Sequence, residues 1–306
     1  MRAAICLTIM TLSSTALAQD VGAFAPGAWN ESTTDVGTRS VLGEEPIRRF
    51  KKQAIQSVAL SGGWLVGTDN DLNSQFFETS IGLGVPLGSL DNILGVTPSF
   101  RVDRIDAADG IDIPSELYEV GVQFFYRKAI NDRWSFMGIV RPAIRSDFTT
   151  DDQAFRIFGL GLLTKDCIPD YLSVSFGAVF LDRADLPLLP AIGLTWTPRT
   201  DMRLDLRFPE SRLSHRLQKN GSQSETWAYL SGGLGGNTWA VTRESGETDE
   251  LSLRDIRLTI GLERILDGGG GWFAEAGYAF KRRLEYESGD EIEFSNGVLF
   301  QAGWSY

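Results

Sequence analysis

From Ala54 to the end of the chain, apolar residues recur at every second position in one segment after another. The segments are about 10 to 15 residues long, and turns rich in Gly, Asp, Asn and Pro separate them. Alternation of this kind places apolar side chains on one face of a strand and polar side chains on the other. After residue 18, no run reaches the roughly 18 consecutive apolar residues of a membrane-spanning helix. The chain is therefore predicted to be all-β.

The clearest predicted strand covers residues 118–126. Tyr118 and Tyr126 bracket its apolar face, as expected where a lipid-facing strand meets both headgroup zones. Its other face carries Glu119, and Arg127 follows on the same side. Residues 155–164 differ because they are apolar on both faces, so alternation does not assign their direction.

The last nine residues also alternate, and the chain ends on an aromatic residue. The last residues of soluble proteins usually fray, so a chain that ends within a strand favours a sheet that closes on itself and leaves no open edge. This closing strand is predicted to direct one apolar face outward, formed by Val298, Phe300, Ala302, Trp304 and Tyr306.

This ending resembles the C-terminal signal of bacterial outer-membrane β-barrels, which have an aromatic last residue and hydrophobic residues at alternate positions before it. Residues 226–230 with the glycines that follow, 256–263 and 275–278 look like an uncharacterised bacterial outer-membrane family of unknown function. The resemblance implies a place in the outer membrane of a Gram-negative envelope, with outer-membrane lipid and the barrel-assembly machinery as partners. It implies no particular activity.

The predicted fold is a transmembrane antiparallel up-and-down β-barrel of about 12 strands, with 14 as the alternative. Counting segments gives about 13, whereas a barrel with both termini on the periplasmic side needs an even number. Residues 201–243 cause the ambiguity, because they can be divided into two long strands or into three or four shorter ones. A secreted soluble β-sandwich that binds a ligand is an alternative fold.

The N-terminus predicts export. Met1-Arg2 is a short positive start, residues 3–12 are an apolar run, and Ala16-Leu17-Ala18 offers a cleavage site. The predicted division is a signal peptide at 1–18, a flexible periplasmic leader at 19–53 and the barrel at 54–306. Folding of part of the leader into the barrel as a plug is an alternative. Cleavage leaves Cys167 as the one cysteine, so no internal disulfide is expected.

The formal net charge is −11, which argues against nucleic acid as a partner because phosphate binding needs a basic stripe. The one basic cluster, at residues 48–52, predicts a solvated collar before the first strand. A contact between this cluster and phosphate or membrane headgroups is the alternative.

No catalytic, metal or cofactor site is predicted. His215 is the one histidine and follows Ser214, but the surrounding residues alternate like an ordinary strand and no Gly-x-Ser-x-Gly elbow occurs. An outer-membrane barrel hydrolase is kept as an alternative. The acidic loops at 69–71, 151–152 and 244–250 lack the spacing of a calcium-binding loop and are expected to be solvated.

Charged residues alternate with the apolar faces and are predicted to point into the lumen. On the lipid side, each Arg or Lys near the midplane would cost about 2 to 4 kcal/mol. Inside, these groups either line a pore for small solutes and set its ion preference, or form a paired network that fills a narrow barrel. The oligomeric state stays open. The candidate lumen residues are Arg101, Asp103, Glu119, Arg127, Arg141, Arg145, Arg203, Asp205, Arg207, Arg257, Glu263 and Glu275.

Deletion of residues 304–306 tests the prediction for the C-terminal strand. Loss of this part of the closing strand is expected to reduce the folded protein in the outer-membrane fraction, measured by heat-modifiable gel mobility. If the truncated chain reaches the membrane and folds as well as the full chain, this segment is not an assembly signal.

Overall fold

The computed structural model describes residues 47–51, 53–69, 71–89, 92–180, 188–207 and 210–306. These residues form strands joined by turns and loops, and among them no helix is long and apolar enough to cross a membrane. The strands are β1 Ile55–Gly67, β2 Leu72–Pro86, β3 Asn92–Ala107, β4 Glu116–Asn131, β5 Trp134–Ser146, β6 Phe155–Ile168, β7 Leu172–Phe180, β8 Leu188–Arg199, β9 Met202–Arg207, β10 Glu210–Asn220, β11 Ser224–Thr242, β12 Thr248–Leu266, β13 Gly271–Tyr286, β14 Glu291–Phe294 and β15 Gly297–Ser305.

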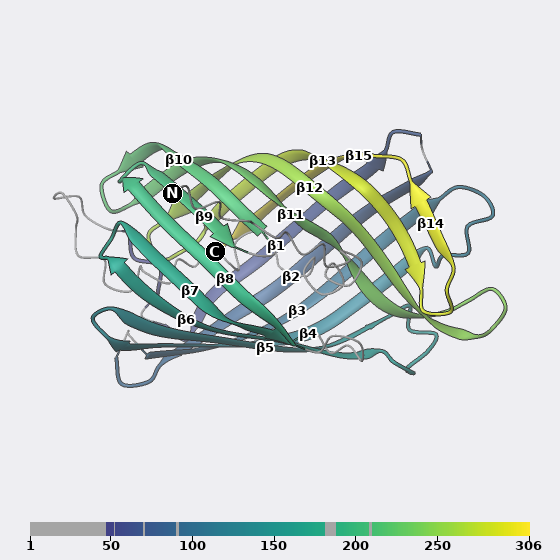
Figure 1. Cartoon of the computed structure of the whole chain (residues 1–306), viewed down its shortest axis with the longest axis horizontal. Coiled ribbons are helices and arrows are strands. Elements are labelled where there is room, and N and C mark those ends of the chain that lie inside the picture. The colour runs from purple at the N-terminus through teal and green to yellow at the C-terminus, as the bar shows by residue number, and fades with distance from the viewer. Residues whose placement is uncertain (1–46, 52, 70, 90–91, 181–187, 208–209) are drawn as a thin grey trace, which may run out of the picture.

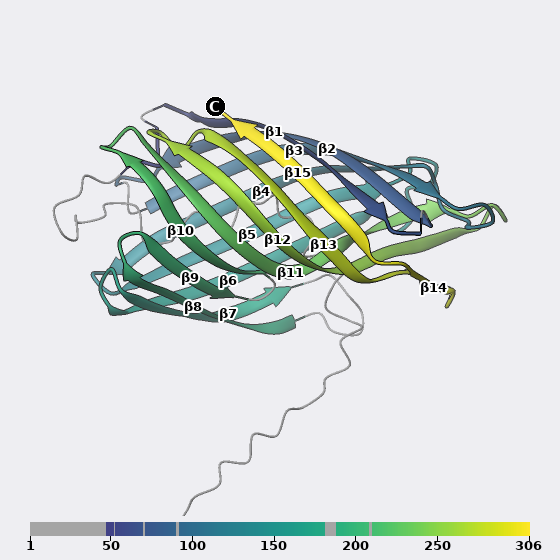
Figure 2. The same ribbon diagram turned by 90° about the horizontal axis from the view of Figure 1, so that it is seen from above.

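The strands make one closed antiparallel sheet (Figure 1). Each strand from β1 to β13 pairs with the next one along the chain, and β15 pairs with both β13 and β1. The short β14 pairs with the far end of β13, so β14 and β15 act as one interrupted strand. In both views the strands run diagonally to the long axis, as barrel closure requires (Figure 2). The result is a barrel of 14 strands.

The outer face of the barrel is apolar. Large hydrophobic side chains point outward from every part of the wall, and Ile192 and Ile260 are 72% and 66% exposed. Soluble proteins rarely expose a contiguous apolar surface of this extent, whereas a membrane barrel buries such a band in lipid. The predicted closing face behaves in the same way, because Val298, Phe300 and Trp304 are all exposed along β15.

The barrel has a turn end and a loop end. Short connections at 87–91, 132–133, 169–171, 200–201, 221–223 and 267–270 define the turn end, which also holds Tyr306. The opposite connections define the loop end and include the longer segments 108–115 and 147–154.

Strand β11 leaves the 14-strand wall near its middle. Its pairing with β10 ends at Glu210↔Gly233, while its pairing with β12 continues to Thr242↔Thr248. Beyond Gly233, β11 bends across to β5 and pairs in parallel at Ala240↔Ser146. Figure 1 shows β11 to β13 extending beyond β7 to β10.

Glycine permits this bend. Gly236 has a φ of +109°, and a Cβ there would lie 1.9 Å from the carbonyl oxygen of Leu253. A register shift in β12–β13 pairing between Arg254 and Ile256 accompanies it. Because β11 meets β5, β6 to β10 drop out of the ring, and the described strands narrow from 14 at the turn end to nine at the loop end.

The structure confirms the predicted all-β barrel. It has 14 strands, which is the alternative to the predicted number of about 12. It divides residues 201–243 into β9, β10 and β11. A single closed sheet does not favour the alternative of a two-sheet sandwich. The predicted signal peptide at 1–18 and most of the predicted leader lie outside the described residues.

Candidate functional site in the barrel lumen

A carboxylate shared by two arginines lies inside the barrel beside the β5–β11 contact. Arg145 donates to Glu119 Oε2 over 3.0 Å, and Arg141 donates to Oε1. The amide of Asn237, on the bent part of β11, also donates to Glu119 Oε2 over 3.0 Å. Glu119, Arg141 and Arg145 are each at most 5% exposed. This buried cluster therefore ties β4 and β5 to the crossing strand.

Further charges pair along single strands. Residues two apart share a strand face, so an arginine and an aspartate in this spacing can pair on the lumen side. Arg101 binds Asp103 through two hydrogen bonds of 2.7 Å, and Arg257 binds Asp255 over 2.6 and 2.9 Å. Arg101 also lies 3.6 Å from Glu78 on the neighbouring strand. Together with the Glu119 cluster, these pairs form a charged layer in the lumen.

An apolar cluster fills the narrowed lumen beyond this layer, towards the loop end. Its side chains come from β2, β3, β4 and β11 to β14, and Ile111 and Ile113 of the β3–β4 loop pack against it. Trp239, one of its members, is 2% exposed. We call this set the plug cluster; its buried members are Leu72, Ile105, Leu117, Trp239, Val241, Leu251, Leu284, Tyr286 and Phe294.

Arg243 ties three loop-end connections together at the plug cluster. It donates to Asp112 over 2.6 Å, to Asp290 over 2.9 Å and to Asp249 over 3.1 Å, and its guanidinium lies 3.7 Å from the ring centre of Tyr286. Burial alone would lower the pKa of Arg243, but the hydrogen bonds to the three carboxylates outweigh it and raise the pKa. The arginine therefore stays charged at any physiological pH.

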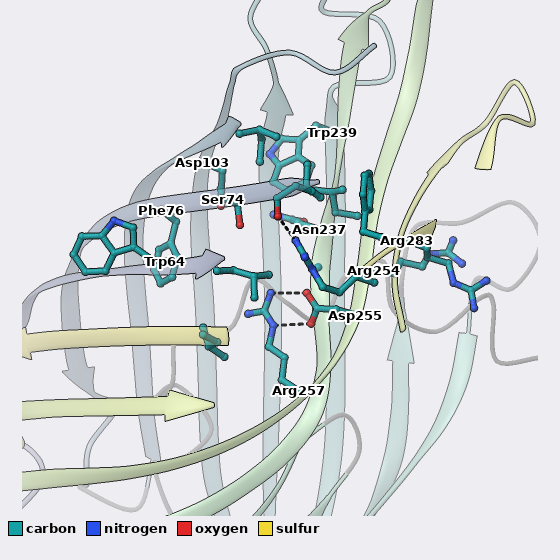
Figure 3. Close-up of a pocket in the computed structure, with 18 of the residues that line it drawn as sticks. Trp64, Ser74, Phe76, Asp103, Asn237, Trp239, Arg254, Asp255, Arg257 and Arg283 are labelled. Atoms are coloured by element: carbon teal, nitrogen blue, oxygen red, sulfur yellow. Dashed lines mark hydrogen bonds and ion pairs between the residues drawn. The ribbon is translucent and has the colours of Figure 1, made fainter. Parts of the chain in front are cut away.

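A cavity separates the plug cluster from the charged layer (Figure 3). Trp239 and Asn237 line it on the β11 side, Ser74 and Asp103 on the β2–β3 side, and the Asp255–Arg257 pair on β12. The indole N–H of Trp239 is buried and has no hydrogen-bond partner among the described atoms. No polar contact in the described part of the chain therefore fixes this ring in place.

The wider turn-end half of the lumen carries ion pairs on β8 to β13. Asp205 accepts from Arg203 over 2.7 and 3.0 Å, from Arg207 over 3.1 Å and from Thr195 over 2.7 Å. Two further contacts each reach across one intervening strand: Arg212 of β10 lies 2.8 Å from Glu263 of β12, and the Tyr229 hydroxyl of β11 donates to Glu275 of β13 over 2.7 Å.

The predicted lumen residues alternate with the exposed apolar side chains, and all but Arg127 take part in the pairs described above. The structure groups Glu119, Arg141 and Arg145, and separately Arg203, Asp205 and Arg207. It does not bring all twelve candidates into one site. Whether they line a pore or fill the barrel stays a prediction.

Sequence reasoning missed part of this lumen. Asp255 could have been found, because it precedes Arg257 by two residues on the same face. The apolar lumen residues Ile105 and Leu117 were also detectable, since they share strand faces with Asp103 and Glu119. The contribution of Trp239 depends on the β5–β11 contact, for which the sequence carries no local signal.

The other residues considered for catalysis or binding lie apart from one another. Ser214 is buried on the lumen face of β10, whereas the next residue, His215, is exposed on the outer face, so the two do not form a dyad. Cys167 is an exposed free thiol. In the basic cluster, Arg48 pairs with Asp267 and Lys51 lies over the Tyr306 ring.

A family model described as "Domain of unknown function (DUF6268)" matches residues 107–294, more than half of the chain. None of the curated proteins matches at a significant level.

Several solved β-barrels are similar in outline. The KdgM porin has 9% identity over 82% of this chain and 98% of its own, with a TM-score of 0.34. The translocator domain of the autotransporter NalP from Neisseria meningitidis has 12% identity over 84% and 89%, with a TM-score of 0.37. OccK5 (OpdH) from Pseudomonas aeruginosa has 11% identity over 82% and 96%, with a TM-score of 0.30. Likenesses this weak carry no conclusion about the function of the present chain.

Replacement of Glu119 by Gln tests the buried charge cluster. The variant leaves Arg141 and Arg145 without their shared carboxylate, so we expect the free energy of unfolding to fall by about 3 kcal/mol or more. The measurement is urea unfolding in detergent or lipid vesicles. Glu116→Gln is the control, because its pair with Arg104 is exposed and is worth at most about 1 kcal/mol. Equal losses in the two variants would contradict the structural role of the cluster.

Proposed function

The chain belongs to the DUF6268 family of unknown function, and we propose that it is a porin-like barrel of the bacterial outer membrane that rests in a closed state and passes small solutes when it opens. The apolar exterior and the single closed sheet support insertion in lipid, because closure gives each strand of the wall a pairing partner on both sides. Outer-membrane lipid and the barrel-assembly machinery are the proposed partners.

The proposed orientation follows from the lengths of the connections. Outer-membrane barrels have short periplasmic turns and longer extracellular loops. We therefore assign the turn end to the periplasm and the loop end, with its plug cluster and Arg243, to the cell exterior. The predicted signal peptide is consistent with this location.

The observation that carries the closed state is the plug cluster. A pore needs a continuous polar path, but side chains from β2 to β4 and β11 to β14 pack together across the extracellular half of the lumen. Below them, the charged layer pairs Glu119 with Arg141 and Arg145 and Arg101 with Asp103. Axial passage therefore requires the plug cluster to move.

The bent end of the β11–β12 hairpin is the element we propose to move. It carries Trp239, Val241 and Leu251 into the plug cluster, and in the described chain one backbone bridge, at Ala240↔Ser146, pairs it with β5. The indole of Trp239 makes no hydrogen bond within the described chain, so its displacement breaks no such bond. By contrast, the turn-end part of β12, from Ile256 to Ile265, stays paired with β13 and forms the wall behind it.

We propose no catalytic activity. The placement of Ser214 and His215 on opposite faces of β10 supports this view, since a nucleophile and its base must lie within hydrogen-bonding reach.

Conductance in planar bilayers tests the proposal. We expect the barrel to be silent with an intact plug cluster and to conduct in steps in the double variant Trp239→Ala, Leu251→Ala, whose truncations open a cavity across the lumen. Recordings use chains with and without residues 19–46, so that the plug cluster is tested apart from the leader. Leu258→Ala, which shortens a lipid-facing side chain of β12, is the matched control.

The decisive comparison is made in the chain that lacks residues 19–46. If the double variant and the Leu258→Ala control conduct equally, the plug cluster does not close the barrel. If neither conducts, the barrel is structural and the proposed passage of solutes is wrong.

A further inference from the structure

The cavity beside the plug cluster holds an ion pair against one of its walls. Arg257 and Asp255, two residues apart on β12, are joined by two hydrogen bonds of 2.6 and 2.9 Å. The pair lies against the backbone of β11, because a Cβ at Gly235 would be 2.1 Å from both Arg257 Nε and Asp255 Oδ1. Glycine at position 235 therefore leaves the space that this pair occupies.

Two donors in the cavity lining have no acceptor within the described chain. Arg257 uses Nε and Nη2 for Asp255, and none of the hydrogen bonds among the described residues uses its Nη1. The side chain of Arg257 is 27% exposed, so its guanidinium has open space beside it. The Nε1–H of Trp239 is the other donor, and Figure 3 shows Trp239 at one end of the cavity and the Arg257–Asp255 pair at the other. Indole and guanidinium N–H groups only donate, so their partner has to be an acceptor.

The carboxylates and the amide of the cavity wall already serve other donors. Both oxygens of Asp103 accept from Arg101, and both oxygens of Asp255 accept from Arg257. The side-chain oxygen of Asn237 accepts from the N–H of the next residue over 3.0 Å. Native structures pair nearly all buried polar groups, because an unsatisfied one is unfavourable. The lining therefore favours a ligand that brings its own acceptors.

One arginine of the cavity wall is poorly neutralised. Arg282 is 3% exposed and donates to the backbone carbonyls of Leu72 and Ser295 over 2.7 and 3.0 Å, while the carboxylate of Asp71 lies 3.8 Å away. Each of the other arginines in the lining lies 3.0 Å or less from a carboxylate oxygen: Arg101, Arg254, Arg257 and Arg283. A buried charge without a close partner is unfavourable. One added negative charge offsets it, which suits a singly charged ligand better than a doubly charged one.

The size and the apolar side of the cavity restrict the ligand further. The cavity has a volume of about 50 Å³, which is room for about three to five water-sized groups. Leu72, Ile105 and Phe294 of the plug cluster also line it. A ligand that meets both kinds of surface has a charged end and a short apolar body.

We propose that this cavity binds a small monocarboxylate. Its oxygens accept from the Arg257 guanidinium, its charge offsets that of Arg282, and its alkyl end lies against the plug cluster. The inference deepens the proposed function by naming the class of solute, and the role of the site in transport rests on that function. Binding itself does not, because the cavity is present in the closed barrel.

Nuclear magnetic resonance of the indole N–H groups tests the proposal in the full-length chain. Trp239 lines the cavity and reports on its contents, and its signal in the ¹⁵N-tryptophan-labelled barrel is the one lost in Trp239→Phe. Sodium propionate is present while the chain folds, so that the closed lumen does not limit access. We expect propionate to shift this signal until it saturates. Propionamide, which has the same shape without the charge, and sodium chloride are expected to leave it in place.

The affinity of the labelled barrel for propionate then tests the role of Arg257. The double variant Arg257→Gln, Asp255→Asn removes both charges of the pair and leaves the net charge unchanged, so we expect propionate to bind at least tenfold more weakly. Arg203→Gln, Asp205→Asn is the matched control, because it neutralises a pair of the same spacing on β9, which does not line the cavity. This control is expected to bind propionate as the unmodified chain does.

Three results would overturn the proposal: a Trp239 signal that propionate does not move, equal shifts with propionate and with propionamide or phosphate, or equal affinities in the two double variants. The conductance recordings distinguish these failures from failure of the proposed function. A barrel that binds propionate but conducts in no variant retains this site and loses the proposed passage of solutes. A barrel that conducts when the plug cluster is truncated but does not bind propionate retains the proposed function and loses this site.

Discussion

The whole structure depends on pairing the backbone of every strand in an environment without water. In lipid, an open sheet edge leaves N–H and C=O groups unsatisfied, at several kcal/mol for each group. The β1–β15 seam meets this constraint where the first and last described strands join. The bent part of β11 is the place where the ordinary pairing order stops. Beyond Gly233 it has lost β10, and its end is joined instead to β5.

The contact between β11 and β5 determines which side chains meet in the lumen. By bypassing β6 to β10, it leaves a nine-strand ring in which inward apolar side chains from opposite walls can meet. Leu117 and Leu251 are fully buried there, although they come from β4 and β12. The Glu119 cluster lies at the same junction and links β4, β5 and β11.

The sequence predicted the elements well because alternation is a local property. The strand at 118–126 and the outward face of 298–306 both follow from the period of two. Alternation also left residues 155–164 unassigned, and the structure shows the reason. Both faces of β6 are apolar because the inner one, with Phe158, Leu160 and Leu162, packs in a buried apolar cluster with residues of β5, β7 and β8.

The closure of β11 on β5 was beyond sequence reasoning, because it joins residues almost a hundred positions apart through a single bridge. Gly235 and Gly236 were visible as an interruption, but not as a bend that redirects the strand. The apolar residues of the plug cluster were missed for a related reason. Alternation indicates that two residues share a strand face, but it does not say whether that face meets lipid or the lumen. The apolar Ile105 is assigned to the lumen only because the charged Asp103 lies on the same face.

The contact between β11 and β5 is tested most directly by disulfide formation between Ser146→Cys and Ala240→Cys in a Cys167→Ser background. Bridged neighbours in a sheet have Cα atoms about 5 Å apart, within the range that a disulfide spans. Thr238 lies two residues earlier on β11, about 6.6 Å away along the strand, so Ser146→Cys with Thr238→Cys is the control. The account predicts efficient cross-linking of 146 with 240 in the folded barrel and little with 238. Absence of the 146–240 cross-link in folded protein would show that β11 does not close on β5, and the narrowed, plugged lumen would then be wrong.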